Sequence, residues 1–156
     1  MNRLKNFLIA ALVSPEVAIG LAVAVFAISA PRTAAALGDA IRSDAEVWKY
    51  LPALTLLFSG AAINSSFKLR APLESFFNKI LYHWPGYQLL VDRVYIGLFY
   101  GISSAAASLA LWIVGQKINP ILTASVFLAA TLISGATALS MLLAQQKLRE
   151  LLEANT

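Results

Sequence analysis

The chain has 156 residues, of which 59% are hydrophobic and 13% are charged, and its mean hydropathy is +0.72. Since soluble domains carry about 25% charged residues, this composition excludes an ordinary soluble domain and indicates an integral membrane protein. The net charge of +4 lies mostly in segments that flank the apolar runs, so it does not predict nucleic acid as a partner.

The first apolar run, residues 7–31, is predicted as the first of four membrane spans. Only 15 residues lie between Glu16 and Arg32, which is about 22 Å of helix against roughly 30 Å of hydrocarbon. Two arrangements therefore fit. Either residues 3–13 form a short helix at the membrane surface and the span begins near Pro15, or one bent span begins earlier and places Glu16 within the hydrocarbon.

The connection over residues 32–49 has equal numbers of acidic and basic residues, and its Ala-rich start could continue the first helix past Pro31. Trp48 and Tyr50 then mark a headgroup boundary, where amphipathic rings are enriched. The second span is predicted over residues 50–67.

Over residues 72–84, apolar side chains recur every three or four positions, as on one face of a helix, and polar side chains occupy the other face. A proline lies at each border of the segment. This pattern predicts an amphipathic helix that lies flat in the membrane interface. Its expected membrane anchors are large apolar side chains on one face and at the following boundary: Phe76, Phe77, Ile80, Trp84 and Tyr87.

The third and fourth spans are predicted over residues 94–116 and 118–145, neither of which contains a charged side chain. A tight turn from Gly115 to Pro120 should join them as an antiparallel hairpin. The predicted fold class is therefore an all-α integral membrane protein. Its four transmembrane helices and the interfacial helix between the second and third spans should form a single membrane-embedded domain over residues 1–156.

The distribution of basic residues predicts the orientation of the chain. Eight Lys and Arg residues fall in the N-terminal segment, in residues 68–93 and in the C-terminal tail, whereas the two other connections hold four. Because cytoplasmic loops are rich in Lys and Arg, both termini should face the cytoplasm of a bacterial-type inner membrane.

Small residues form stripes on the last two spans, and such stripes allow close helix packing in lipid. They are consistent with packing inside one bundle or with a subunit interface. The stripe residues are Gly97, Gly101, Ser104 and Ser108 on the third span, and Ala130, Ser134 and Ala138 on the fourth. Hydroxyl groups on the fourth span either line a polar pathway or bond to their own helix backbone; they belong to Thr123, Thr131, Ser134, Thr137 and Ser140.

Glu16 is the candidate intramembrane ionisable site. A carboxylate within the hydrocarbon would indicate a proton or cation site. The simpler interpretation is a solvated glutamate at a helix start, since Ser14 and Pro15 form a typical N-terminal signal before it. Asp92 and Arg93 should form a local ion pair at the headgroups.

We expect neither a cofactor nor a resident metal. The chain has no cysteine and a single histidine, His83, which excludes Cys-ligated sites and multi-histidine sites within one subunit. No nucleophile elbow, P-loop, dinucleotide or metalloprotease motif occurs, so we do not expect an enzyme.

The leading functional hypothesis is a non-catalytic membrane subunit that anchors or scaffolds a larger or homo-oligomeric assembly. Its partners would be the lipid bilayer, further copies of the chain, or other membrane or cytosolic subunits. One alternative is a small ion or solute transporter or channel that uses Glu16. Another is a membrane sensor or effector of a stress or phage-defence system.

Overall fold

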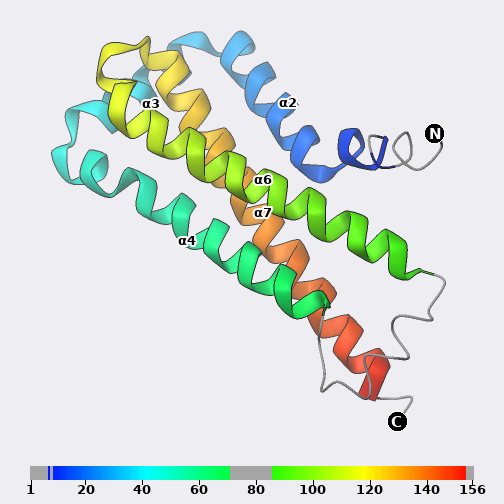
Figure 1. The fold of residues 1–156 in the computed structure, drawn as a ribbon. Coiled ribbons are helices and arrows are strands. Elements are labelled where there is room, and N and C mark those ends of the chain that lie inside the picture. Colours follow the sequence, from blue (N-terminus) through cyan, green and yellow to red (C-terminus); the bar gives the residue numbers. More distant parts are fainter. Residues whose placement is uncertain (1–6, 8, 71–85, 154–156) are drawn as a thin grey trace.

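The computed structural model of the chain describes residue 7, residues 9–70 and residues 86–153, and the regular elements in these ranges are helices (Figure 1). In chain order they are α2 (Pro15–Ser29), α3 (Pro31–Ser43), α4 (Ala45–Arg70), α6 (Tyr87–Val114), the 3-10 turn η1 (Gly115–Lys117) and α7 (Pro120–Glu153). The predicted interfacial helix over residues 72–84 lies outside the described residues.

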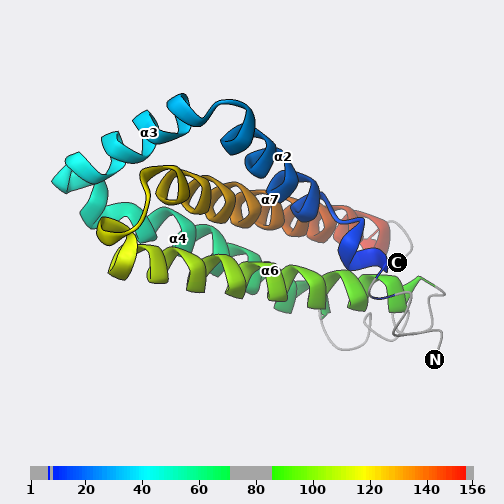
Figure 2. The same cartoon turned by 90° about the horizontal axis from the view of Figure 1, so that it is seen from above.

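Three long helices, α4, α6 and α7, run side by side, and α2 and α3 form a bent arm against them (Figures 1 and 2). Helix α7 is central because it contacts α2, α3, α4 and α6. We call the end of the bundle that holds η1 and α3 the hairpin end. The opposite end, where α4 ends, α6 begins and α7 ends, is the terminal end.

The helices support a membrane protein but not four spans. Among the described residues, two helices are long and apolar enough to cross a bilayer, over Tyr87–Lys117 and Pro120–Glu150. They correspond to the predicted spans 94–116 and 118–145 and to the predicted hairpin. A third span results only if α2 and α3, which are bent by 105° at their junction, are counted as one broken span. The predicted count of four is therefore wrong.

Of the two arrangements predicted for residues 7–31, the structure agrees with the one in which a helix begins at Pro15, and it adds a second break at Ala30. The backbone is extended at Ser14 (φ −71°, ψ 151°), and α2 starts at Pro15 as the helix-start signal predicts. Helix α2 ends at Ser29 after 15 residues, about 22 Å, and Ala30 follows as its C-cap residue. The next residue, Pro31, lacks an N–H and disfavours a helical conformation at Ala30. A new helix, α3, therefore begins at Pro31, and α2 does not continue.

The predicted second span, residues 50–67, underestimates the length of α4 and overestimates its apolar character. The helix starts five residues earlier because the Asp44 carboxylate accepts hydrogen bonds from the backbone N–H groups of Glu46 (2.9 Å) and Val47 (3.1 Å). This is an ordinary acidic N-cap. Along the rest of α4 the apolar run is interrupted by polar side chains, which are Thr55, Ser59, Asn64, Ser65 and Ser66.

The interior of the bundle has an apolar cluster at each end and small residues between them. At the terminal end, Leu69, Val94, Met141 and Leu148 pack together, and Tyr87 packs against this cluster. At the hairpin end the cluster consists of Ile41, Leu51 and Leu111. The buried residues between these clusters are mostly alanine, serine and threonine, whose small side chains allow helices to pack closely.

Candidate functional site

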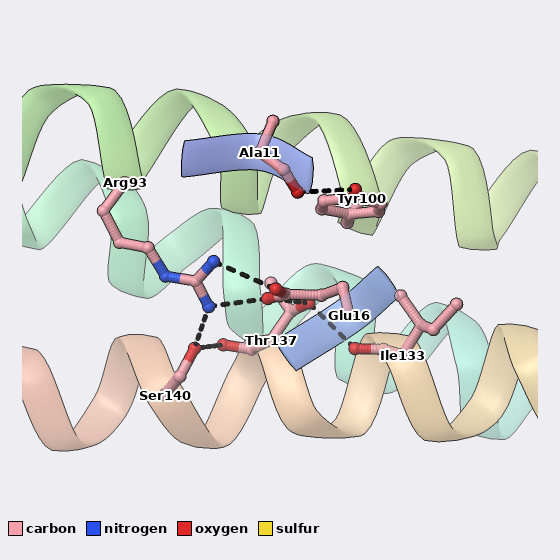
Figure 3. Close-up of polar contacts among 7 residues, drawn as sticks. All are labelled: Ala11, Glu16, Arg93, Tyr100, Ile133, Thr137 and Ser140. Atoms are coloured by element: carbon pink, nitrogen blue, oxygen red, sulfur yellow. Dashed lines mark hydrogen bonds and ion pairs between the residues drawn. The ribbon is translucent and has the colours of Figure 1, made fainter. Parts of the chain in front are cut away.

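A buried ion pair joins α2 to α6 near the terminal end of the bundle (Figure 3). The Arg93 guanidinium donates two hydrogen bonds to the Glu16 carboxylate, from Nη1 to Oε2 at 3.0 Å and from Nη2 to Oε1 at 2.6 Å. The Glu16 side chain is fully buried, whereas the Arg93 side chain is 28% exposed. This bidentate geometry is the strongest form of an arginine–carboxylate interaction.

Helix α7 supplies the other polar partners of the pair. Thr137 Oγ1 lies 3.1 Å from Glu16 Oε1 and 2.8 Å from the Ile133 carbonyl, so its single proton serves one of these two acceptors at a time. Arg93 Nη2 also donates to Ser140 Oγ at 2.9 Å. Thr137 and Ser140 are three residues apart and therefore share a face of α7. The site thus ties α2, α6 and α7 together.

A second contact holds the chain on the other side of the break at Ser14. Tyr100 lies seven residues after Arg93, on the same face of α6, and its hydroxyl donates to the Ala11 carbonyl at 3.2 Å (Figure 3). One face of α6 therefore holds both the turn that precedes α2 and the first turn of α2. This arrangement fixes where the arm begins on the bundle.

Two expectations about these charges are wrong. Glu16 is not a solvated residue at a helix start, because the bundle covers its side chain completely. Arg93 does not form a local pair with Asp92 but turns inward to Glu16, which lies 77 positions away in the sequence. A buried carboxylate requires a counter-charge. Arg93 meets this requirement, although nothing in the sequence identifies it as the partner.

The site is an ion pair in which both oxygens of the carboxylate are already bonded to the guanidinium. The Glu16 carboxylate accepts two hydrogen bonds from Arg93 and lies within reach of the Thr137 hydroxyl, so its charge is neutralised within the chain. Within residues 7, 9–70 and 86–153, no group of three or more His, Cys, Asp or Glu side chains could hold a metal ion. His83 and the anchors Phe76, Phe77, Ile80 and Trp84 lie outside the described residues.

The hydroxyl groups of α7 mostly serve its own backbone. Ser134, Thr137 and Ser140 each donate to the carbonyl three or four residues earlier, at 2.8–3.1 Å. Thr123 Oγ1 lies 3.3 Å from the Asn119 carbonyl and 3.2 Å from the Gly115 carbonyl in η1. The Thr131 hydroxyl lies 3.2 Å from that of Thr55 on α4, and Thr137 also reaches Glu16. The pattern agrees with backbone bonding rather than with a continuous pathway.

The small-residue stripes lie inside the chain's own bundle. On α6 the buried members are Gly97, Gly101, Ser104 and Ser108, and on α7 they are Ala130, Ser134 and Ala138. A Cβ atom on Gly101 would make ordinary contact with Ala62 on α4, at 3.9 Å. These stripe positions are therefore occupied by intramolecular contacts.

Gly97→Ala should destabilise the bundle by only about 1 kcal/mol. The added Cβ would overlap Met141 Cε, which is the far end of a flexible side chain, and would otherwise meet Thr137 Cγ2 at 3.4 Å. Because the Met141 side chain can move aside, most of the overlap can be relieved. Detergent-titration unfolding followed by circular dichroism measures the change. A loss above 3 kcal/mol would show that Met141 cannot move.

Comparison of the whole chain with protein families, with curated proteins and with solved structures finds no match.

Proposed function

We propose that this chain is a non-catalytic, membrane-embedded helical subunit that anchors or scaffolds a larger or homo-oligomeric assembly. The observation that carries this proposal is the closure of the one buried ion pair among the described residues. Glu16 is neutralised by Arg93 and is covered by α6 and α7. A carboxylate with this environment fastens a helix to its neighbours and is poorly suited to take up a transported cation.

The outer surface supports the same proposal. Large apolar side chains are exposed on every long helix and on the arm, as in Val25 of α2, Leu57 of α4, Phe99 of α6 and Leu143 of α7. An apolar surface of this extent suits lipid or the helices of other subunits. The placement in a bacterial-type inner membrane with both termini in the cytoplasm belongs to the proposal and rests on the distribution of Lys and Arg.

Native mass spectrometry of the tagged chain, released from mild detergent, tests this proposal. The expected result is a defined complex, either with further copies of the chain or with a co-purifying protein. A monomer that never carries a protein partner at any detergent concentration would contradict it.

A flux measurement separates the proposal from the transport alternative. Wild type and Glu16→Gln are reconstituted into vesicles at equal density, and uptake of protons and monovalent cations is followed. We expect no flux above that of empty vesicles in either case, because the site is closed by Arg93. Flux in the wild type that is lost in Glu16→Gln would replace the scaffold with a transporter. Thr55→Val, which changes a hydroxyl that contacts Thr131 and not Glu16, serves as the matched control.

A further inference from the structure

A groove of about 620 Å³ lies at the hairpin end of the bundle, far from the Glu16–Arg93 pair. The end of α3, the start of α4, the end of α6 and η1 all contribute to its walls. The side chains that define it are Arg42, Trp48, Lys49, Trp112, Ile113 and Gln116. Its volume falls within the range of sites that bind small molecules or the head of a lipid.

The two cations of the hairpin-end groove differ from Arg93 in having no carboxylate partner. Arg93 is paired with Glu16, whereas neither Arg42 nor Lys49 forms an ion pair with another described residue. Lys49 lies over the ring of Tyr50, with its Nζ 5.2 Å from the centroid. No acidic side chain lines the groove, since Asp44 caps α4 instead. The charged residues that line the groove are therefore both cations.

Arg42 is held in place although its charge is unpaired. Its Nη2 donates to the Gln116 carbonyl, and Gln116 Nε2 donates back to the Arg42 carbonyl at 3.4 Å. A guanidinium has five N–H donors, so this contact leaves donors for an anion. The reciprocal bonds join the end of α3 to η1 and fix one wall of the groove.

The apolar part of the groove lies beside its charged part. The Trp48 ring packs directly on Gly115, so that a Cβ atom added to Gly115 would lie 2.6 Å from the ring. Trp48 also packs against the hairpin-end cluster. Trp112 and Ile113 are exposed on the last turn of α6, where the predicted membrane span ends. Tryptophan at this level is typical of the boundary between hydrocarbon and headgroups.

We propose that the hairpin-end groove binds an anionic phospholipid. Arg42 and Lys49 would contact the phosphate of the headgroup, while Trp48, Trp112 and Ile113 would line the first carbons of its acyl chains. Basic pockets between membrane helices select anionic headgroups by the same combination of charge and interfacial position. This inference needs membrane embedding, but it is independent of whether the chain forms an assembly.

Quenching of tryptophan by brominated lipid tests this site directly. All samples carry Trp84→Phe, so that the signal comes from Trp48 and Trp112, which both line the groove. The protein is placed in nanodiscs of phosphatidylcholine that contain increasing fractions of brominated phosphatidylglycerol. We expect saturable quenching at a low lipid fraction, whereas brominated phosphatidylcholine should quench only in proportion to its amount.

Removing the cations should weaken this selectivity. Each of Arg42→Gln and Lys49→Gln should lower the preference for phosphatidylglycerol about fivefold. The matched control is Arg32→Gln with Lys117→Gln, which removes two exposed cations from α3 and η1 that do not line the groove. Circular dichroism verifies that each variant is folded, and Lys49→Gln alone decides the outcome if Arg42→Gln disturbs η1.

Three results would overturn the lipid site. They are equal quenching by the two brominated lipids, an equal loss of preference in the control pair, or displacement of brominated phosphatidylglycerol by millimolar inorganic phosphate. The last result would assign the groove to a free anion.

Discussion

Arg93→Ala should destabilise the protein by about 3–5 kcal/mol, because it leaves the fully buried Glu16 carboxylate without its counter-charge. The unpaired carboxylate must then become protonated or pull the start of α2 out of the bundle. Unfolding in mixed detergent micelles, followed by circular dichroism, measures the loss of stability. A loss below 1 kcal/mol would contradict the importance of the pair.

The two partners should not be equivalent. Glu16→Gln removes the charge that Arg93 needs, but the Arg93 side chain is already 28% exposed and lies near the terminal end of the bundle. It can turn its guanidinium toward the headgroups, as long basic side chains do near helix ends. We therefore expect Glu16→Gln to cost less than half as much as Arg93→Ala. Combining Glu16→Met with Arg93→Met should recover most of the loss, since neither charge remains.

A labelling experiment identifies which part of the fold is loosened by Arg93→Ala. The chain has no cysteine, so Val23→Cys places a unique thiol on the buried face of α2. Its reaction with a water-soluble maleimide should be slow in the otherwise native protein and much faster with Arg93→Ala. An unchanged rate together with a large loss of stability would show that the pair stabilises α6 and α7 but does not hold α2.

Gly38→Ala should be the most damaging glycine substitution, with a loss of about 3 kcal/mol or more. An added Cβ would overlap the Pro120 carbonyl oxygen and would lie 2.9 Å from Pro120 Cα. These are backbone atoms at the first residue of α7, so they cannot move aside as a flexible side chain can. The substitution should separate α3 from α7, and unfolding in mixed micelles measures the effect.

Gly60→Ala is the matched control for this prediction. Gly60 is also a helical residue, but apart from its chain neighbours and its own helix backbone nothing lies within 4 Å of the position that a Cβ would take. Alanine should therefore be neutral there, or stabilising by up to about 1 kcal/mol through its higher helix propensity. If both alanine variants lost stability equally, close approach of α3 to α7 would not be the cause.

Local signals in the sequence predict helix starts and turns but not which charges meet. Pro15 starts α2 and the turn near Gly115 joins α6 to α7, as their residue types indicate. The long apolar runs of α6 and α7 are also recognised correctly, because length and hydropathy are properties of one segment. The same reasoning fails at Ala30, where the effect of Pro31 on the preceding residue outweighs a good helical composition on both sides.

The candidate site depends on contacts that no spacing rule describes. Glu16, Arg93 and Thr137 are brought together by the packing of three helices, and each is separated from the next by more than 40 residues. From the sequence, a carboxylate beside a helix-start signal is more simply explained by water than by a distant arginine. The cap of α4 is different, because Asp44 could have been recognised from the acidic residue before a helical segment.

The central position of α7 has a consequence for biosynthesis. This helix contacts each of α2, α3, α4 and α6, yet it follows all of them in the chain and is therefore synthesised after them. During translation, Gly38 has no Pro120 to pack against and Glu16 has no Thr137 beside it. Arg93 emerges earlier, so the ion pair can form first and shield the carboxylate in the nascent chain. The arm can make its contacts with α7 only after the ribosome has synthesised the part of that helix that contains Pro120, Ile133 and Thr137.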